Sequence, residues 1–272
     1  MRETEYGDVA SVTVAWRQVL KEEGYEPPVI SARTCLKYRL LSRAWRRILG
    51  HTGLGRFAPV RALEFGCGGG VHLVPLYANG WHCTGVDCSE EVLARARRYA
   101  EAARNGPCPA RGQIDLVCHD FIDFDPGETR FDLAYQFGVL EHFLDDAERL
   151  RYLRKMFEVT RPGGFVVSAV PNGCHPLRRE QREHGLGGYR IPEIDYSPAQ
   201  IGEEMRKCGA TAVKVLPHDL FGYSRIRDRR GIRKVADDLR YYLFQAPFFH
   251  FMPASFLTRH AYWLIAIACK PE

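Results

Sequence analysis

The sequence of 272 residues lacks the long apolar runs and leader segments that would assign it to a membrane or a secretory route. Its longest apolar run, Ala261 to Cys269, is less than half of the roughly 20 residues that a membrane-spanning helix needs. The first residues, Met1 to Asp8, contain no apolar stretch that resembles a signal peptide. We therefore expect a protein that is neither secreted nor membrane-spanning and that works in the cytoplasm.

Paired cysteines and a strong charge of one sign are also lacking. The nine cysteines are an odd number, and none forms a C-x-x-C pair, which argues against a disulfide framework or a structural zinc site. The net charge of +5 is too mild over this length to indicate nucleic acid as a partner. These absences favour an ordinary globular protein in a reducing compartment.

From residue 60 onward, short apolar runs alternate with segments of helical periodicity, a pattern typical of an α/β protein with a mainly parallel sheet. Two helices, 8–24 and 31–49, are expected before this region. The expected strands are 60–65, 82–86, 113–118, 131–137, 165–170, 211–216 and 261–269, and the helices between them are 70–79, 89–104, 143–158 and 198–208.

This alternation of strands and helices suggests three parts of the chain. Residues 1–50 would form an N-terminal helical cap, and 51–217 together with 261–272 would form the core domain. Residues 218–260 do not follow this alternation and are expected to be an insertion, either a substrate lid or a dimer contact. A second irregular stretch, 171–196, follows the fifth strand.

The strongest chemical signal is a glycine-rich turn, Glu64 to Gly70, between the first strand and the next helix. Glycines at such a bend let the backbone approach a ligand closely. Twenty-one residues after Gly66, Asp87 ends the second strand, where a carboxylate can accept both hydroxyls of a ribose. The alternative role for Asp87 is to start the following helix.

The glycine spacing distinguishes between two nucleotide ligands. A dinucleotide-binding turn would need glycine or alanine at position 71, which is valine here. The pattern E-x-G-x-G-x-G resembles motif I of class I S-adenosylmethionine-dependent methyltransferases. The resemblance continues in order through Asp120-Phe121, Phe131 to Tyr135, Leu140-Glu141-His142, Arg161 to Gly164 and Tyr196-Ser197-Pro198.

The resemblance implies a Rossmann-like sheet of seven strands, mostly parallel, with 261–269 as the reversed strand, and S-adenosyl-L-methionine as the cofactor. Gly66 and Gly68 would border the methionine part. Asp87, beside Cys88, would hold the ribose. Asp120 and Phe121 would bind the adenine, Gln136 and Phe137 would lie near the sulfonium, Glu64 would orient the loop or the ligand's amino group, and Cys67 would fill space within the loop.

Catalysis needs a base only where the acceptor carries a proton that it must lose, and His142 is the first candidate because an imidazole titrates near neutral pH. Its alternative role is to fix the helix start or the cofactor loop. His175 is the second candidate. Glu141 is not expected to pair with His142, since adjacent helical residues diverge. Some quinone-related family members bind a divalent metal here through an acidic and histidine cluster, but the sequence offers only these two residues, so no metal is expected.

The acceptor is the least defined part. We expect methyl transfer to an oxygen or nitrogen of a small biosynthetic or lipid-like molecule, without nucleic acid as a partner. RNA or protein methylation, a non-catalytic scaffold that binds S-adenosylmethionine, and a nicotinamide oxidoreductase are the alternatives. The basic run 225–234 and the aromatics that follow it would be a solvated face, a cover for an anionic and partly apolar substrate, a homodimer contact or a membrane-surface segment.

Overall fold

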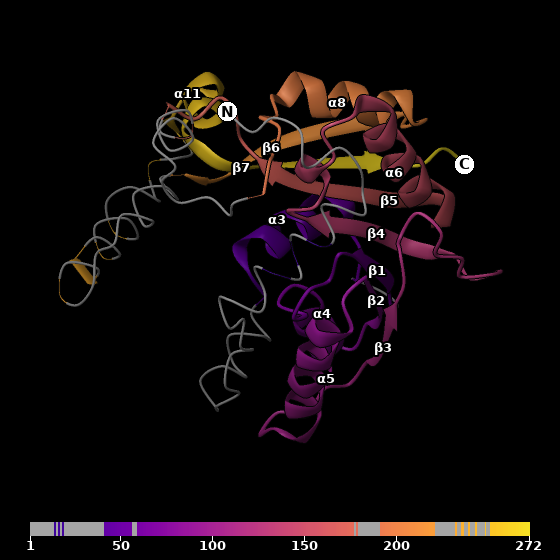
Figure 1. Ribbon diagram of the computed structural model, residues 1–272. Helices are drawn as coiled ribbons and strands as arrows, with labels where there is room; N and C mark the ends of the chain where they lie inside the picture. The colour runs from indigo at the N-terminus through magenta and orange to yellow at the C-terminus, as the bar shows by residue number, and fades with distance from the viewer. Residues whose placement is uncertain are drawn as a thin grey trace.

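The computed structural model describes residues 41–55, 59–176, 178, 191–220 and 251–272, with isolated residues between 14 and 18 and between 232 and 248. The described chain folds around a seven-stranded sheet of order β3-β2-β1-β4-β5-β7-β6. The last strand, β7, runs antiparallel to both of its neighbours, and the remaining pairs are parallel (Figure 1). The predicted sheet, including its reversed strand at 261–269, is confirmed.

The predicted core elements are all present, with bounds that differ by a few residues. The strands are β1 Arg61–Phe65, β2 His82–Asp87, β3 Gln113–Cys118, β4 Phe131–Phe137, β5 Thr160–Pro171, β6 Ala212–Leu220 and β7 Ala261–Cys269. The helices are α3 Arg43–Thr52, α4 Leu73–Ala78, α5 Glu90–Asn105, α6 Asp146–Val159, α8 Pro198–Lys207 and α11 Ala254–His260, with a 3-10 turn η1 at Leu140–His142.

Helices cover both faces of the sheet because successive strand residues point to opposite sides. Ala62 of β1 packs in a core cluster with residues of α3, α4 and α5. The next residue, Leu63, packs in a second cluster with residues of α6 and α8. Burial on both faces explains why the strands read as nearly continuous apolar runs. Figure 1 shows α4 and α5 on one side of the sheet and α6 and α8 on the other.

Two boundaries differ from the sequence prediction because of contacts that the structure shows. The helix expected from residue 143 begins at Asp146, because the carboxylate of Asp145 accepts the Glu148 N–H at 3.0 Å and caps it there. Strand β6 continues three residues past 217, because β7 offers it ladder partners as far as the Leu220–Ala261 pair. The predicted insertion therefore departs from the sheet after Leu220.

Most of the predicted cap 1–50 and most of 218–260 lie outside the described residues, and the roles of both segments stay predictions. The described end of the cap region is α3, whose Trp45 is buried and whose Arg47 guanidinium donates to the Pro217 carbonyl. These contacts join α3 to the core. In the described part of the chain, no helix combines the length and the apolar character that crossing a membrane requires.

Candidate active site

The glycine turn after β1 has a backbone that other residues would strain. Gly66, Gly68 and Gly70 all have positive φ angles, of 64°, 51° and 79°. The turn is tied to β2, since the Gly66 and Cys67 N–H groups both donate to the Val86 carbonyl, at 2.8 and 3.1 Å. The glycines thus set a fixed, sharply bent backbone at the carboxyl end of β1.

Two of these glycines meet different surroundings. A Cβ atom at Gly66 would lie 2.5 Å from Val139 Cγ2, so the turn after β4 packs directly against this position. A Cβ at Gly68 would have no heavy atom within 4 Å. Gly66 is therefore required by packing within the protein. Gly68 faces open space, as a backbone that receives a ligand would.

Asp87 links the glycine turn to the start of α5. Its Oδ2 atom accepts the Gly68 N–H at 2.9 Å, and its Oδ1 atom accepts the Ser89 N–H at 3.0 Å. The helix-start contact that was the alternative role of Asp87 is thus present. It does not exclude a ribose, because each carboxylate oxygen can accept a further hydrogen bond. The adjoining Cys88 is half-buried and forms no disulfide with another described cysteine.

Asp120 and Phe121 follow β3 at the same end of the sheet. The Asp120 carboxylate accepts the Ile122 N–H at 2.9 Å, which shapes the turn. The Phe121 ring is buried and meets the Tyr152 ring edge-on at a centroid distance of 4.5 Å. Its ring is therefore anchored in the second core cluster, and the predicted contact with an adenine stays a prediction.

Two buried groups support the turn from within the sheet. Glu64 accepts a hydrogen bond of 3.2 Å from the Tyr135 hydroxyl, and burial raises the pKa of its carboxyl well above the usual value. The Cys67 sulfur lies 2.8 Å from where a Gly85 Cβ would stand, and burial also raises the pKa of its thiol. Cys67 thus remains a thiol that packs inside the loop, as the sequence suggested.

Gln136 and Phe137 end β4, but their side chains are engaged by the protein. The Gln136 amide donates to the Ser168 hydroxyl, and its Oε1 atom accepts the Val139 N–H at 2.9 Å. The Phe137 ring stacks on His72 with centroids 4.0 Å apart and planes at 9°. Both side chains therefore shape the turn after β4, and only their backbone is left to border a sulfonium.

His142 is buried in the 3-10 turn that follows β4, with its Nδ1 atom 3.1 Å from the Pro192 carbonyl oxygen. A carbonyl can only accept, so Nδ1 carries the proton and Nε2 keeps a free electron pair. Burial lowers the pKa of His142, which keeps the ring neutral at pH 7. The Trp16 ring from the N-terminal region meets it edge-on at 5.1 Å.

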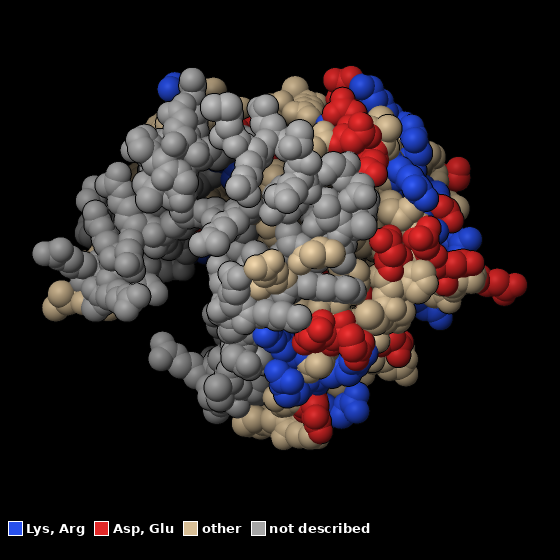
Figure 2. Space-filling model, viewed as in Figure 1, with Lys and Arg blue, Asp and Glu red and all other residues tan. Residues whose placement is uncertain are grey.

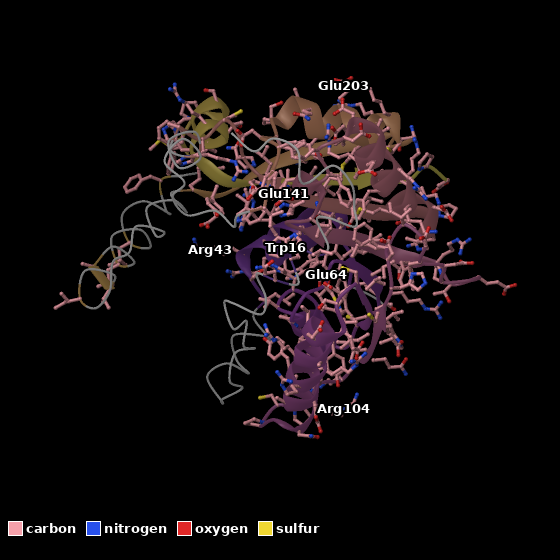
Figure 3. All side chains as sticks on the ribbon, in the orientation of Figure 1. Trp16, Arg43, Glu64, Arg104, Glu141 and Glu203 are labelled. Carbon is pink, nitrogen blue, oxygen red and sulfur yellow. The ribbon has the colours of Figure 1, made fainter. Side chains whose placement is uncertain are left out.

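Glu141, the neighbour of His142, is a buried acid. Among the described residues, its Oε2 atom is buried and has no hydrogen-bond partner. Burial raises the pKa of its carboxyl to about 8, so the group is mainly protonated at neutral pH. Figure 3 labels Glu141, Trp16 and Glu64, which fall in the middle of this view.

The second candidate base lies in the loop after the next strand. His175 is buried near His260 of α11, with ring centroids 6.3 Å apart. Burial, with a contribution from His260, lowers the pKa of His175 to about 4. Arg178, which follows His175 in the chain, forms one ion pair with Glu193 and another with Asp195, the second at 2.6 Å.

Sequence reasoning missed several contributors to this site. Trp16, His72 and Arg178 reach it from segments that no local motif singles out. No group of three or more potential metal ligands occurs within the described ranges. The predicted aromatic cover over the site is only partly described: Phe248 and Phe251 are exposed, and Phe249 lies outside the described residues. The lid stays a prediction.

Comparison with known proteins agrees with this geometry. Residues 62–164 match the family described as "Methyltransferase domain". The chain is 32% identical over 113 residues to a ubiquinone biosynthesis O-methyltransferase of Rhodopseudomonas palustris, covering 42% of this chain and 40% of that protein. A Caulobacter protein of the same name is 32% identical over 124 residues, covering 44% and 45%. The match thus spans less than half of the length of these curated relatives.

Solved structures show the same fold at low identity. A Thermotoga maritima protein, titled a SAM-dependent methyltransferase and possible histamine N-methyltransferase, has a TM-score of 0.58 at 16% identity, covering 95% of this chain and 99% of that one. The Burkholderia thailandensis 1,6-didemethyltoxoflavin-N1-methyltransferase has a TM-score of 0.55 at 17% identity, covering 97% and 89%. Residues 62–164 therefore match a methyltransferase domain, and the chain has the Rossmann-like fold of these solved methyltransferases.

Proposed function

We propose that this protein transfers a methyl group from S-adenosyl-L-methionine to an oxygen or nitrogen atom of a small-molecule acceptor. The observation that carries the proposal is the meeting, at one end of the sheet, of the open backbone at Gly68, the carboxylate of Asp87 and the neutral imidazole of His142. The first two fit a ribose-bearing cofactor, and the third fits removal of a proton from an acceptor.

The cofactor fits the residues present. Gly66 and Gly68 would border its methionine part, Asp87 beside Cys88 would hold the ribose, and Asp120 would reach the adenine amine. The backbone of Gln136 and Phe137 would lie on the sulfonium side. When bound, the cofactor supplies an electrophilic methyl group, whose bond to sulfur breaks, leaving the electron pair on sulfur, as the bond to the acceptor forms.

His142 is the base in this proposal. It takes the proton of the acceptor hydroxyl or ammonium group at Nε2, because Nδ1 is held as a donor by the Pro192 carbonyl. A lowered pKa keeps the base form available at neutral pH. Trp16 packs on the imidazole and restricts its orientation, so it would also border the acceptor. His175, in the following loop, is the second candidate for the same role.

The acceptor is proposed to be a small biosynthetic or lipid-like molecule. The curated relatives are named as O-methyltransferases of ubiquinone biosynthesis, and a structural neighbour is titled as a methyltransferase with its small-molecule substrate and S-adenosylhomocysteine bound. Figure 2 is consistent with this class, since acidic and basic side chains are interspersed over the described surface in view. None of the eight described cysteines forms a disulfide, which supports a reducing, cytoplasmic setting.

Thermal unfolding with added ligands tests the cofactor directly. We expect S-adenosylmethionine and S-adenosylhomocysteine to stabilise the protein, and NAD to have no effect. A ligand that binds only the native state adds about 2.7 kcal/mol at a hundredfold excess over its Kd. Stabilisation by NAD alone would overturn the assignment.

Mass spectrometry of reactions with phenolic and amine acceptors then tests the transfer. Methylated small molecules support the proposal. Cofactor binding with methylation of RNA or protein only would favour that alternative, and binding with no transfer to any class would favour a scaffold.

A further inference from the structure

Arg149 of α6 holds the chain that follows His142. Its buried guanidinium donates from Nη1 to the carbonyls of Phe143 and Leu144, at 2.9 Å each. Because η1 ends at His142, these carbonyls belong to the two residues directly after the candidate base. Arg149 also pairs with the exposed Asp146. It therefore fixes the chain as it leaves the 3-10 turn.

Glu204 of α8 joins Arg149 to a second side chain. Its Oε1 atom accepts the Arg149 Nε–H at 3.2 Å, and its Oε2 atom accepts the Tyr196 hydroxyl at 2.9 Å. Burial, with the Glu204 carboxylate nearby, raises the pKa of the Tyr196 hydroxyl, which therefore keeps its proton and donates. One buried carboxylate thus binds a cation from α6 and a hydroxyl from the chain before α8.

Tyr196 ends a segment, residues 191–196, that contacts the candidate base directly. The Pro192 carbonyl of this segment lies 3.1 Å from Nδ1 of His142 and accepts its proton. The Tyr196 side chain is fully buried, and its hydroxyl meets Glu204 there. The position of the Pro192 carbonyl therefore depends on where Tyr196 is held.

Backbone hydrogen bonds tie the same segment to both candidate loops. The Ile194 N–H donates to the Glu141 carbonyl at 2.8 Å. The Tyr196 carbonyl accepts the Gly173 N–H, also at 2.8 Å. The segment thus lies between the turn that follows β4 and the loop that follows β5, and the side chain of Tyr196 anchors its end.

We propose that Glu204 is a positioning residue for His142. It joins the two segments that flank the imidazole, one through Arg149 and the other through Tyr196, and so fixes the place and the tautomer of the ring. Nδ1 then stays a donor to the Pro192 carbonyl, and Nε2 keeps the electron pair that takes the proton of the acceptor. The inference rests on the proposed function, in which His142 is the base.

A role in stability alone explains this network less well. An ion pair taken out of water adds little net stability, because the loss of hydration offsets the attraction between the charges. Buried polar groups that are all satisfied instead favour one arrangement of the chain over others. Here the groups that Arg149 and Glu204 satisfy are the carbonyls that follow His142 and the hydroxyl that anchors the segment of Pro192.

Nitrogen NMR of the full chain with isotopically labelled histidine tests the proposal. The nitrogen shifts of a neutral imidazole report which atom carries the proton, and His142→Asn identifies the signals of this residue. The wild type should show the Nδ1–H tautomer and a pKa below the ordinary value. Glu204→Ala should give a mixture of tautomers, with a pKa that rises toward about 6.5 as water reaches the ring. Tyr196→Phe, which removes a single hydroxyl, should shift both properties in the same direction.

Glu204→Gln is the conservative rescue. Its amide oxygen can accept from Arg149, and its amide nitrogen can donate to the hydroxyl oxygen of Tyr196. Both links of the network then persist without the negative charge. The tautomer and the pKa of His142 should therefore stay close to those of the wild type.

Two controls on α8 separate positioning from general effects. Glu203→Ala removes the neighbouring exposed carboxylate, which pairs with Lys207 at 2.8 Å and is labelled at the edge of the view in Figure 3. Met205→Ala removes a fully buried apolar side chain from the same helix and should lower stability. Neither control should change the tautomer of His142.

The proposal is overturned if Glu204→Ala and Tyr196→Phe leave the tautomer and the pKa of His142 as in the wild type. It is also overturned if Met205→Ala changes them equally, or if Glu204→Gln behaves as Glu204→Ala does. If Glu204→Ala does not fold, Tyr196→Phe decides the outcome by the same measurement. Methylation is not read by NMR, so a failure of the proposed function would be seen separately, in the mass spectrometry of acceptor reactions.

Discussion

Replacing Gly66 or Gly68 with alanine should damage the protein in two different ways. Both glycines have positive φ, which costs an alanine roughly 1–2 kcal/mol. At Gly66 the new methyl group would also lie 2.5 Å from Val139 Cγ2, and overpacking of this kind costs about 1–3 kcal/mol more. We expect Gly66→Ala to lower the free energy of unfolding by about 2–5 kcal/mol.

Gly68→Ala should lower the free energy of unfolding only by the cost of the positive φ angle, because no atom lies within 4 Å of its Cβ position. Its main effect should be on binding, since the methyl group would occupy the space that we assign to the cofactor. Urea unfolding measures the stability of each variant, and calorimetric titration measures its affinity for S-adenosylhomocysteine. The expected result is a crossed pattern: a large stability loss for Gly66→Ala, and a large affinity loss for Gly68→Ala.

The double variant Gly66→Ala with Val139→Ala isolates the clash. Shortening Val139 removes the atom at 2.5 Å, so the double variant should recover part of the stability that Gly66→Ala loses. The reasoning is refuted if both single variants lose equal stability, or if Gly68→Ala binds S-adenosylhomocysteine as the wild type does.

Four further predictions concern the site. Asp87→Ala should weaken S-adenosylhomocysteine binding by about 1.5–3 kcal/mol in calorimetry. Unchanged affinity would show that Asp87 only stabilises the start of α5. If His142 is the base, activity should fall as pH drops through its lowered pKa, because the imidazole is then protonated. The pH–rate profile of His142→Asn should lack this acidic decline. A decline that persists in the variant would point to His175 as the base. The folded-state pKa of Glu141, about 8, lies above the ordinary value, so its contribution to stability is complete at acidic pH and is lost as pH rises from about 4.5 to 8. Glu141→Gln should flatten that decline in urea unfolding, and an unchanged pH dependence would contradict the assigned burial effect. Trp16→Ala should raise the KM for the acceptor and leave the affinity for the cofactor unchanged. A loss of cofactor affinity with an unchanged acceptor KM would show that Trp16 does not border the acceptor.

The sheet could be predicted from the sequence because its signals are local. Each strand is a short apolar run, and the glycine turn and Asp87 lie at strand ends that a parallel sheet must bring to one edge. The start of α6 moved because of a local cap at Asp145, whereas the end of β6 depends on a distant partner, the β7 ladder that extends it to Leu220.

The chemistry of the side chains was harder to predict, because it depends on packing between remote segments. The proton position on His142 follows from a carbonyl 50 residues away, that of Pro192. The side chains of Gln136 and Phe121 contact neighbours from β5 and α6, and their expected roles beside the cofactor stay predictions. No pattern within a single segment contains that information.

The pairing of Leu220 with Ala261 has a consequence for how this fold can change. A segment whose two ends are already held together by the sheet adds little closure entropy when it grows, since the cost rises only logarithmically with length. The stretch between β6 and β7 is therefore a site where residues can be gained, lost or exchanged without disturbing the strands on either side. Changes of acceptor preference between related proteins can accumulate there, while the glycine turn after β1 stays under the strict steric limits set by Val139.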